Sequence, residues 1–273
     1  MLQTTSSLPR TEGSVRLELV GRGNRTRLFR LEQSGAARLR FPRTDPADPC
    51  EAVLINTAGG LTGGDQFQVA AALGAGARAV LTTAAAEKIY RSRQGHARVS
   101  VALSVAGDGD LAWLPQPTIV FDRARLERLT EIELDAQARF LGVEMLIFGR
   151  TAMGESVWQG SLRDGWRLRR AGVLLFADSF RLEGPIAQAL ARPAVLDGAR
   201  ATGLLLYAAP DAAARLHEVR ALAQGAASLL GVSSYNGLLL ARAVAPDGRT
   251  LQADLTRLLA GLHAGALPRI WKC

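Results

Sequence analysis

The residues with the clearest chemical potential lie in a glycine-rich segment, residues 56–65, which reads Asn-Thr-Ala-Gly-Gly-Leu-Thr-Gly-Gly-Asp. Its four glycines are Gly59, Gly60, Gly63 and Gly64. Glycine loses more backbone entropy on ordering than any other residue, so this density indicates positive φ angles or a closely approached backbone. A P-loop would end in Gly-Lys-Ser/Thr, and a dinucleotide loop would space its glycines as G-x-G-x-x-G. This segment ends in the anion Asp65, which disfavours phosphate as a ligand.

Catalytic chemistry has few candidates elsewhere. The histidines His96, His217 and His263 are each isolated in the sequence, whereas a metal site needs clustered His, Cys or carboxylate ligands. No G-x-S-x-G motif marks a nucleophilic serine. A triad assembled from scattered residues stays open, but the sequence predicts no catalytic residues, no tight metal site and no tightly bound cofactor. We therefore expect a protein that is not an enzyme.

Residues 82–92 follow a predicted strand and concentrate polar side chains. The string contains Glu87, Lys88, Tyr90 and Arg91 within five positions. Without a function it would be a solvated turn with a weak internal ion pair. These four residues are our first candidates for a partner-binding surface.

Two further strings have unusual composition. Trp113 shortly precedes Pro115 and Pro117, which predicts an extended, donor-poor backbone at an edge or an exposed corner where another chain could dock. Residues 148–155 contain Arg150 and end in Gly-Glu, like the Gly-Asp end of the first segment. Trp113 and Arg150 complete the partner-surface candidates.

Composition indicates a soluble cytoplasmic protein. The 273 residues carry a net charge of +8, and only Lys88 and Lys272 among the 33 basic residues are lysines. The dispersed arginines favour an acidic partner over nucleic acid, because no aromatic-interleaved RNA motif accompanies them. We expect no secretory signal and no membrane span. The cysteines, Cys50 and Cys273, are expected to be cytosolic thiols.

Apolar and polar residues alternate through the first two thirds, as in half-buried strands. The predicted strands cover residues 14–20, 26–32, 52–56, 66–73, 77–82, 97–105, 130–136, 140–148, 166–170, 173–177 and 203–207. The turn signals between them are residues 74–76, 107–110, 164–165 and 171–172. Short strands joined by tight turns indicate an all-β body instead of βαβ units.

The last quarter changes to helical periodicity. Apolar stripes at residues 216–230 and 251–262 predict two core-facing helices, the first with Asp211 as a plausible N-cap, around a strand at 237–244. The predicted fold class is mainly β, with two stacked, mostly antiparallel sheets and two helices. We expect one domain over residues 1–273, of which 1–13 are flexible.

At these strings the sequence resembles the UreD family of urease accessory proteins, also called UreH. The matching strings are residues 56–65, 86–92, 113–116, 148–155 and 267–271, in the order of the family. The resemblance implies a non-catalytic scaffold that binds urease apoprotein and, with UreF and UreG, helps install nickel in urease. It also implies a body of two stacked sheets and an internal water-filled tunnel for nickel. GTP hydrolysis would belong to UreG, which agrees with the missing P-loop.

The resemblance also gives acidic residues a role in nickel passage, since weak oxygen ligands let a divalent ion leave again. Asp65 matches a family residue tied to the tunnel, and Glu144 and Asp178 match positions where the family tends to have carboxylates. Glu155 is a further candidate. The alternative for each is an ion pair with a neighbouring arginine.

Two other functions stay open. The first is a β-sandwich enzyme or small-molecule-binding protein that uses residues 59–65 as a ligand clamp. The second is a basic nucleic-acid-binding module, which would show steeply salt-dependent binding.

Overall fold

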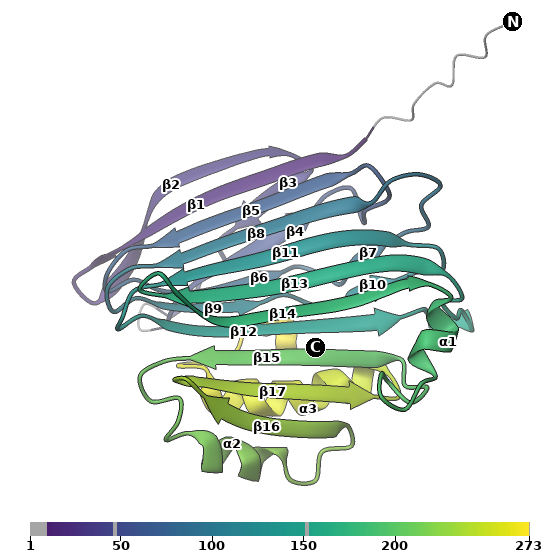
Figure 1. Ribbon diagram of the computed structural model, residues 1–273. Helices are drawn as coiled ribbons and strands as arrows, with labels where there is room; N and C mark the ends of the chain where they lie inside the picture. Colours follow the sequence, from purple (N-terminus) through teal and green to yellow (C-terminus); the bar gives the residue numbers. More distant parts are fainter. Residues whose placement is uncertain (1–9, 46–47, 151–152, 273) are drawn as a thin grey trace, which may run out of the picture.

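The computed structural model describes residues 10–45, 48–150 and 153–272, and its body consists of two packed β-sheets (Figure 1). The seven-stranded sheet contains β1 (Glu12–Arg22), β2 (Arg25–Gly35), β5 (Gln66–Leu73), β8 (Ala97–Val105), β11 (Arg125–Leu134), β13 (Gly160–Arg170) and β14 (Val173–Gly184). The ten-stranded sheet contains β3 (Ala37–Arg40), β4 (Cys50–Asn56), β6 (Arg78–Thr83), β7 (Glu87–Ile89), β9 (Asp110–Leu114), β10 (Thr118–Val120), β12 (Arg139–Phe148), β15 (Ala201–Ala208), β16 (Leu229–Tyr235) and β17 (Leu238–Ala245). The mainly β class is confirmed.

The strand directions differ from the prediction. From β4 to β13 the chain alternates between the sheets, so β1, β5, β8, β11 and β13 pair in parallel in one sheet. In the other sheet β4, β6, β9 and β12 also pair in parallel. Antiparallel pairs occur towards the margins, as in β1–β2, β13–β14 and β15–β17. The sheets are therefore mixed and wound like a β-solenoid, and the prediction of mostly antiparallel sheets was wrong.

The glycine turns explain this error. Residues 74–76 and 107–109 do not close hairpins; they carry the chain from one sheet to the other, at the left-hand end of Figure 1. The turns stack, since Gly76 N donates to Asp108 Oδ1 (2.8 Å) and Gly107 N to Asp135 Oδ2 (2.7 Å). Residues 164–165 lie inside β13, whereas 171–172 do join two antiparallel strands. Turn residues predict a reversal but not the strand to which the chain returns.

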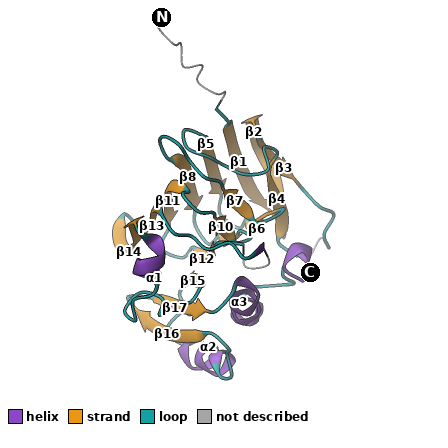
Figure 2. Cartoon of the chain, turned by 90° about the vertical axis from the view of Figure 1, so that its right-hand side faces the viewer, coloured by secondary structure: helices purple, strands orange, loops and turns teal. Residues whose placement is uncertain are grey.

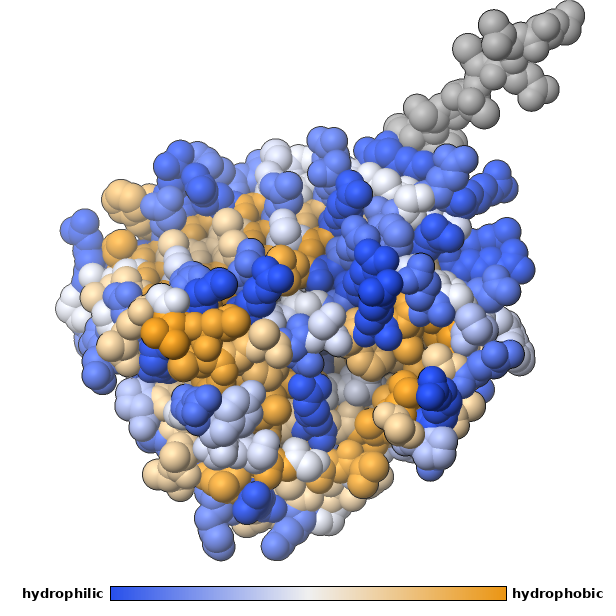
Figure 3. Space-filling view, viewed as in Figure 1, coloured by the Kyte–Doolittle hydropathy of each residue, from blue (hydrophilic) through white to orange (hydrophobic). Residues whose placement is uncertain are grey.

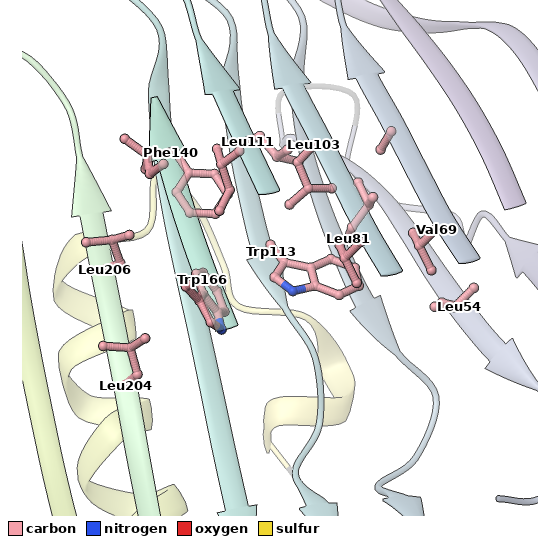
Figure 4. Close-up of a cluster of buried hydrophobic side chains, with 14 of the residues drawn as sticks. Leu54, Val69, Leu81, Leu103, Leu111, Trp113, Phe140, Trp166, Leu204 and Leu206 are labelled. Carbon is pink, nitrogen blue, oxygen red and sulfur yellow. The ribbon is translucent and has the colours of Figure 1, made fainter. Parts of the chain in front are cut away.

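The main core lies between the sheets, where alternate side chains of both meet (Figure 4). Leu81, Leu103, Phe140 and Trp166 are buried there. Trp113 also points into this core and is only 5% exposed, so the exposed corner predicted for it was wrong. The prolines that follow Trp113 come after β9 ends and leave its inward position intact.

A second core covers the other face of the ten-stranded sheet (Figure 2). The helices there are α2 (Leu216–Ala223) and α3 (Gly248–Leu262), followed by a 3₁₀ turn at Arg269–Lys272. Asp247 caps α3, since its Oδ1 accepts a hydrogen bond from Thr250 N (2.8 Å). The core-facing stripe of α3 and the strand before it are confirmed.

The first predicted helix is shorter than expected. It ends at Ala223, Gly225 has φ 72°, and Leu229 begins β16. Asp211 is no N-cap; its carboxylate accepts hydrogen bonds from Arg139 and Tyr207. An additional short helix, α1 (Ile186–Leu190), was not predicted.

The ends of the chain are described in part. Residues 1–9 and Cys273 lie outside the described residues, whereas Glu12 already belongs to β1.

Cys50 has a free thiol, and burial raises its pKa. None of the helices in the described ranges is long and apolar enough to cross a membrane.

Candidate functional site

The polar strings of the sequence gather at one end of the sheets, which faces the viewer in Figure 2; we call it the loop end. Backbone hydrogen bonds join them. Leu61 N donates to Lys88 O (2.8 Å), and Tyr90 N donates to Leu61 O (2.7 Å). Glu87 N donates to the carbonyl of Pro117 (2.9 Å). Segments far apart in sequence therefore form one continuous structure.

The glycine-rich segment is a closely packed part of this end. Gly59, Gly60 and Gly64 have φ of 74°, 153° and 93°. At Gly63 a Cβ would lie 1.9 Å from Ser92 Oγ, so a side chain has no room there. The glycines therefore allow both positive φ angles and close contact between this backbone and neighbouring segments, as the sequence predicted.

Asp65, the last residue of this segment, points into the protein. Its side chain is buried (4% exposed), its Oδ1 accepts a hydrogen bond from Thr11 N and its Oδ2 one from Thr62 N, both at 2.8 Å. Its backbone carbonyl accepts a third, from Arg98 N (2.9 Å). Both carboxylate oxygens thus tie backbone segments together and are already occupied by donors.

We expect Asp65→Ala to lower the free energy of unfolding by about 2–3 kcal/mol, because two backbone N–H groups would lose their acceptor. Urea denaturation measures this change. A variant whose free energy of unfolding is unchanged would contradict this structural role.

A buried charged network lies between the sheets. Arg128 of β11 donates from Nε to Asp164 Oδ1 (3.0 Å) and from Nη1 to Thr118 Oγ1 (2.9 Å), and its Nη2 is paired with both Asp164 and Glu144. Trp166 Nε1 donates to Glu144 Oε2 (2.9 Å). We call these five residues the interior network.

Burial and charge act against each other in the interior network. Burial by itself would lower the pKa of Arg128, but Asp164 and Glu144 together raise it, so the guanidinium stays charged. Burial raises the pKa of Glu144 well above its usual range, with Arg128 opposing the shift. One arginine therefore pairs with two carboxylates.

The interior network borders a cavity of about 60 Å³, whose polar lining includes Glu87, Thr118, Arg128 and Glu144. A second hollow of about 110 Å³ reaches the exposed residues Gly59 and Lys88 and shares Thr83 and Glu87 with the first. The two hollows adjoin at Thr83 and Glu87, and we call the line from the loop end past Glu87 to Glu144 the polar route.

Glu87 stands where the two hollows adjoin. Asn56 Nδ2 donates to its Oε1 and Oε2 (3.2 and 3.1 Å). Burial raises the pKa of Glu87, and these hydrogen bonds counteract the shift. Glu87 thus lies between the interior and the surface, whereas the sequence made it a candidate for a partner-binding surface.

The other predicted carboxylates lie outside the lining of both hollows. Asp178 of β14 pairs with Arg242 of β17 (2.9 Å), and Glu155 pairs with Arg150 (2.6 Å). Of the four nickel-passage candidates, Glu144 alone therefore lines the interior cavity. The remaining surface candidates, Lys88, Tyr90, Arg91 and Arg150, are exposed at the loop end.

Sequence reasoning missed Arg128, Asp164 and Trp166. A usable signal existed, since Leu162, Asp164, Trp166 and Leu168 occupy alternate positions and lie on the inner face of β13. An acid on an apolar strand face predicts a buried partner. Reading residues 164–165 as a turn hid this pattern.

The fold also brings a serine, a histidine and a carboxylate together. His96 Nε2 lies 3.1 Å from Ser161 Oγ, but its Nδ1 lies 3.8 Å from Glu127 Oε1, beyond a hydrogen bond. Glu127 also pairs with Arg98 and Arg163, and Ser161 is buried. This arrangement lacks the coupling that activates a nucleophile.

Over the described ranges, no group of three or more His, Cys, Asp or Glu is placed to hold a metal ion.

Comparison with known proteins gives matches over nearly the whole chain. The family model described as UreD urease accessory protein matches residues 11–272. A urease accessory protein UreD from Xanthobacter autotrophicus is 50% identical over 262 residues, 96% of this chain and 90% of the relative. Proteins of the same name from a Methylobacterium species and from Azorhizobium caulinodans are 48% and 45% identical, with 95% and 96% of their lengths covered.

Proposed function

Since the chain belongs to the UreD family of urease accessory proteins, we propose that it acts in the maturation of urease. In this proposal it is a non-catalytic cytoplasmic scaffold that binds urease apoprotein and, with UreF and UreG, supports delivery of nickel to the urease active site. UreG makes contact through UreF. No nucleic acid or membrane takes part.

The observation that carries the proposal is the extent of the match: it covers every element of the fold, including the loop end and the C-terminal turn. The relatives are covered over at least nine tenths of their own length as well. Similarity on this scale supports a shared role of the whole domain, not of one motif.

The polar route from Glu87 to Glu144 supports nickel as cargo. Carboxylate oxygens hold a divalent ion less firmly than several imidazoles or a thiolate, so an ion can be passed on. Arg128 occupies one oxygen of Glu144 and would be displaced by an entering cation. We assign passage to Glu87 and Glu144, and structural pairing to Asp65, Asp178 and Glu155.

The clamp function considered from the sequence finds no support in the loop geometry. At Gly60 a Cβ would lie 2.3 Å from the Tyr90 ring, and at Gly63 1.9 Å from Ser92 Oγ, so the protein itself occupies the space beside these two glycines. A ligand would have to displace that packing.

Co-expression tests the proposal. Urease structural subunits, UreF and UreG are produced in nickel-supplemented cells with and without this chain, and nickel per purified urease is measured. We expect nickel to fall to background without the chain, at equal levels of urease protein. Full nickel loading in its absence would refute the proposed function.

A further inference from the structure

The loop end carries the exposed side chains of Tyr90, Met153 and Trp158 and the half-buried ring of Phe121; we call these four residues the patch. Met153 is 72% exposed and Trp158 is 65% exposed. The Tyr90 ring meets Phe121 edge-on, with centroids 5.1 Å apart, and the Arg150 guanidinium lies over the Phe121 ring at 4.6 Å. Aromatic residues, methionine and arginine are the types enriched in protein interfaces.

The loops that carry the patch are fixed to one another. Ser92 N donates to Arg123 O (3.0 Å), and Trp158 N donates to Asp122 Oδ1 (2.8 Å). Arg123 N donates in turn to Gln159 O (2.8 Å). The backbone segments next to Tyr90, Phe121 and Trp158 are therefore bonded to one another, which lowers the entropy that they lose when a partner binds.

Positive charge surrounds the patch. The exposed cations are Lys88, Arg91, Arg93, Arg123, Arg125 and Arg150. Among the acids near these cations, Asp122 and Glu155 are already paired with Arg123 (3.5 Å) and Arg150 (2.6 Å), and Glu87 accepts hydrogen bonds from Asn56. Within the described residues, no carboxylate lies within ion-pair distance of the other four cations. Figure 3 shows hydrophilic side chains gathered at the right-hand edge, the end to which these loops belong.

From these observations we infer that the patch is the docking surface for an acidic protein partner, which places an apolar pocket over Trp158 and carboxylates opposite Lys88, Arg91, Arg93 and Arg125. The inference rests on the proposed function, in which that partner belongs to urease maturation. Lys88 also lines the outer hollow, so the docked partner would cover the entrance of the polar route.

Charge decides between possible occupants. A second copy of this chain would bring the same cations face to face, which costs several kcal/mol for close like charges. Single-stranded nucleic acid would need free ring faces for stacking. The Phe121 ring is already covered by Arg150 and met by Tyr90, which leaves Trp158 as the free ring of the patch, whereas a run of stacked bases needs several.

The test uses the full chain and purified urease apoprotein and UreF as separate probes, with affinities measured by surface plasmon resonance. Trp158→Ala is expected to weaken binding of one probe by about tenfold or more, as at an interface hot spot. Arg91→Glu with Arg93→Glu should slow association of the same probe about tenfold at low salt, and much less at high salt.

Matched controls lie elsewhere on the molecule. Leu229→Ala removes an exposed apolar side chain from β16, and Arg22→Glu with Arg25→Glu reverses two exposed charges at the opposite end. Both should bind as wild type does. Binding of both probes by the loop-end variants at wild-type strength would overturn the inference, as would a dimer or an RNA complex that Trp158→Ala dissociates. Failure of the wild-type chain to bind either probe would instead refute the proposed function.

Discussion

Arg128→Met is expected to lower the free energy of unfolding by about 3–5 kcal/mol, because it leaves Glu144 and Asp164 buried without their cation. Methionine fills a similar volume, so the loss reports charge and hydrogen bonding instead of a cavity. Thermal or urea unfolding at neutral pH measures the change.

A matched control separates this effect from the loss of any arginine. Arg163→Met removes an arginine from the neighbouring strand β13, where its ion pairs with Glu127 and Glu183 are exposed. It should cost less than about 1 kcal/mol. Replacing the three charged residues of the interior network together, with Arg128→Met, Glu144→Gln and Asp164→Asn, should recover part of the lost free energy of unfolding. Equal small effects of Arg128→Met and Arg163→Met would show that the interior network does not stabilise the fold.

Substituting Asp for both Leu255 and Leu258 is expected to abolish folding. Each leucine is fully buried against the ten-stranded sheet, and each substitution removes apolar contact and buries a carboxylate. Two such costs of at least about 3 kcal/mol each sum to about 6 kcal/mol or more, a loss as large as the total stability of many domains, which is roughly 5–15 kcal/mol. Circular dichroism and recovery of soluble protein measure the outcome.

The control keeps the same charge change on the same helix. Ala253 and Ala260 lie on the exposed face of α3, and Asp at both positions should leave the fold intact. If the buried-face variant instead folds normally but no longer binds UreF, α3 is an interface and its assignment to the core fails.

Secondary structure was largely predictable from this sequence, but strand order was not. Alternation such as that in residues 97–105 identifies a half-buried strand wherever its neighbours lie. Whether β6 returns beside β5 or crosses to the other sheet depends on long-range pairing, which turn residues 74–76 do not encode. The predicted hairpins therefore became crossings, and the sheets became mixed.

The candidate site was predictable where a residue's role is local. The loop glycines were assigned correctly, because close approach and positive φ are demands of the backbone itself. The exposed corner predicted for Trp113 was wrong, and the donors to Asp65 were not predictable, since burial and the identity of hydrogen-bond donors arise only after distant segments pack. Arg128 and Asp164 come from different strands, and only the fold brings them together.

Nickel loading of urease with Glu144→Gln measures the central claim most directly. The amide keeps the size of the side chain and an acceptor for Trp166 but cannot ionise when a cation arrives, so the route loses its inner carboxylate. Glu133→Gln, on the exposed face of β11, is the matched control. With folding and UreF binding of each variant verified, the account predicts nickel per urease reduced several-fold for Glu144→Gln and unchanged for Glu133→Gln. Wild-type nickel content with Glu144→Gln and with Glu87→Gln would contradict passage of nickel through this chain.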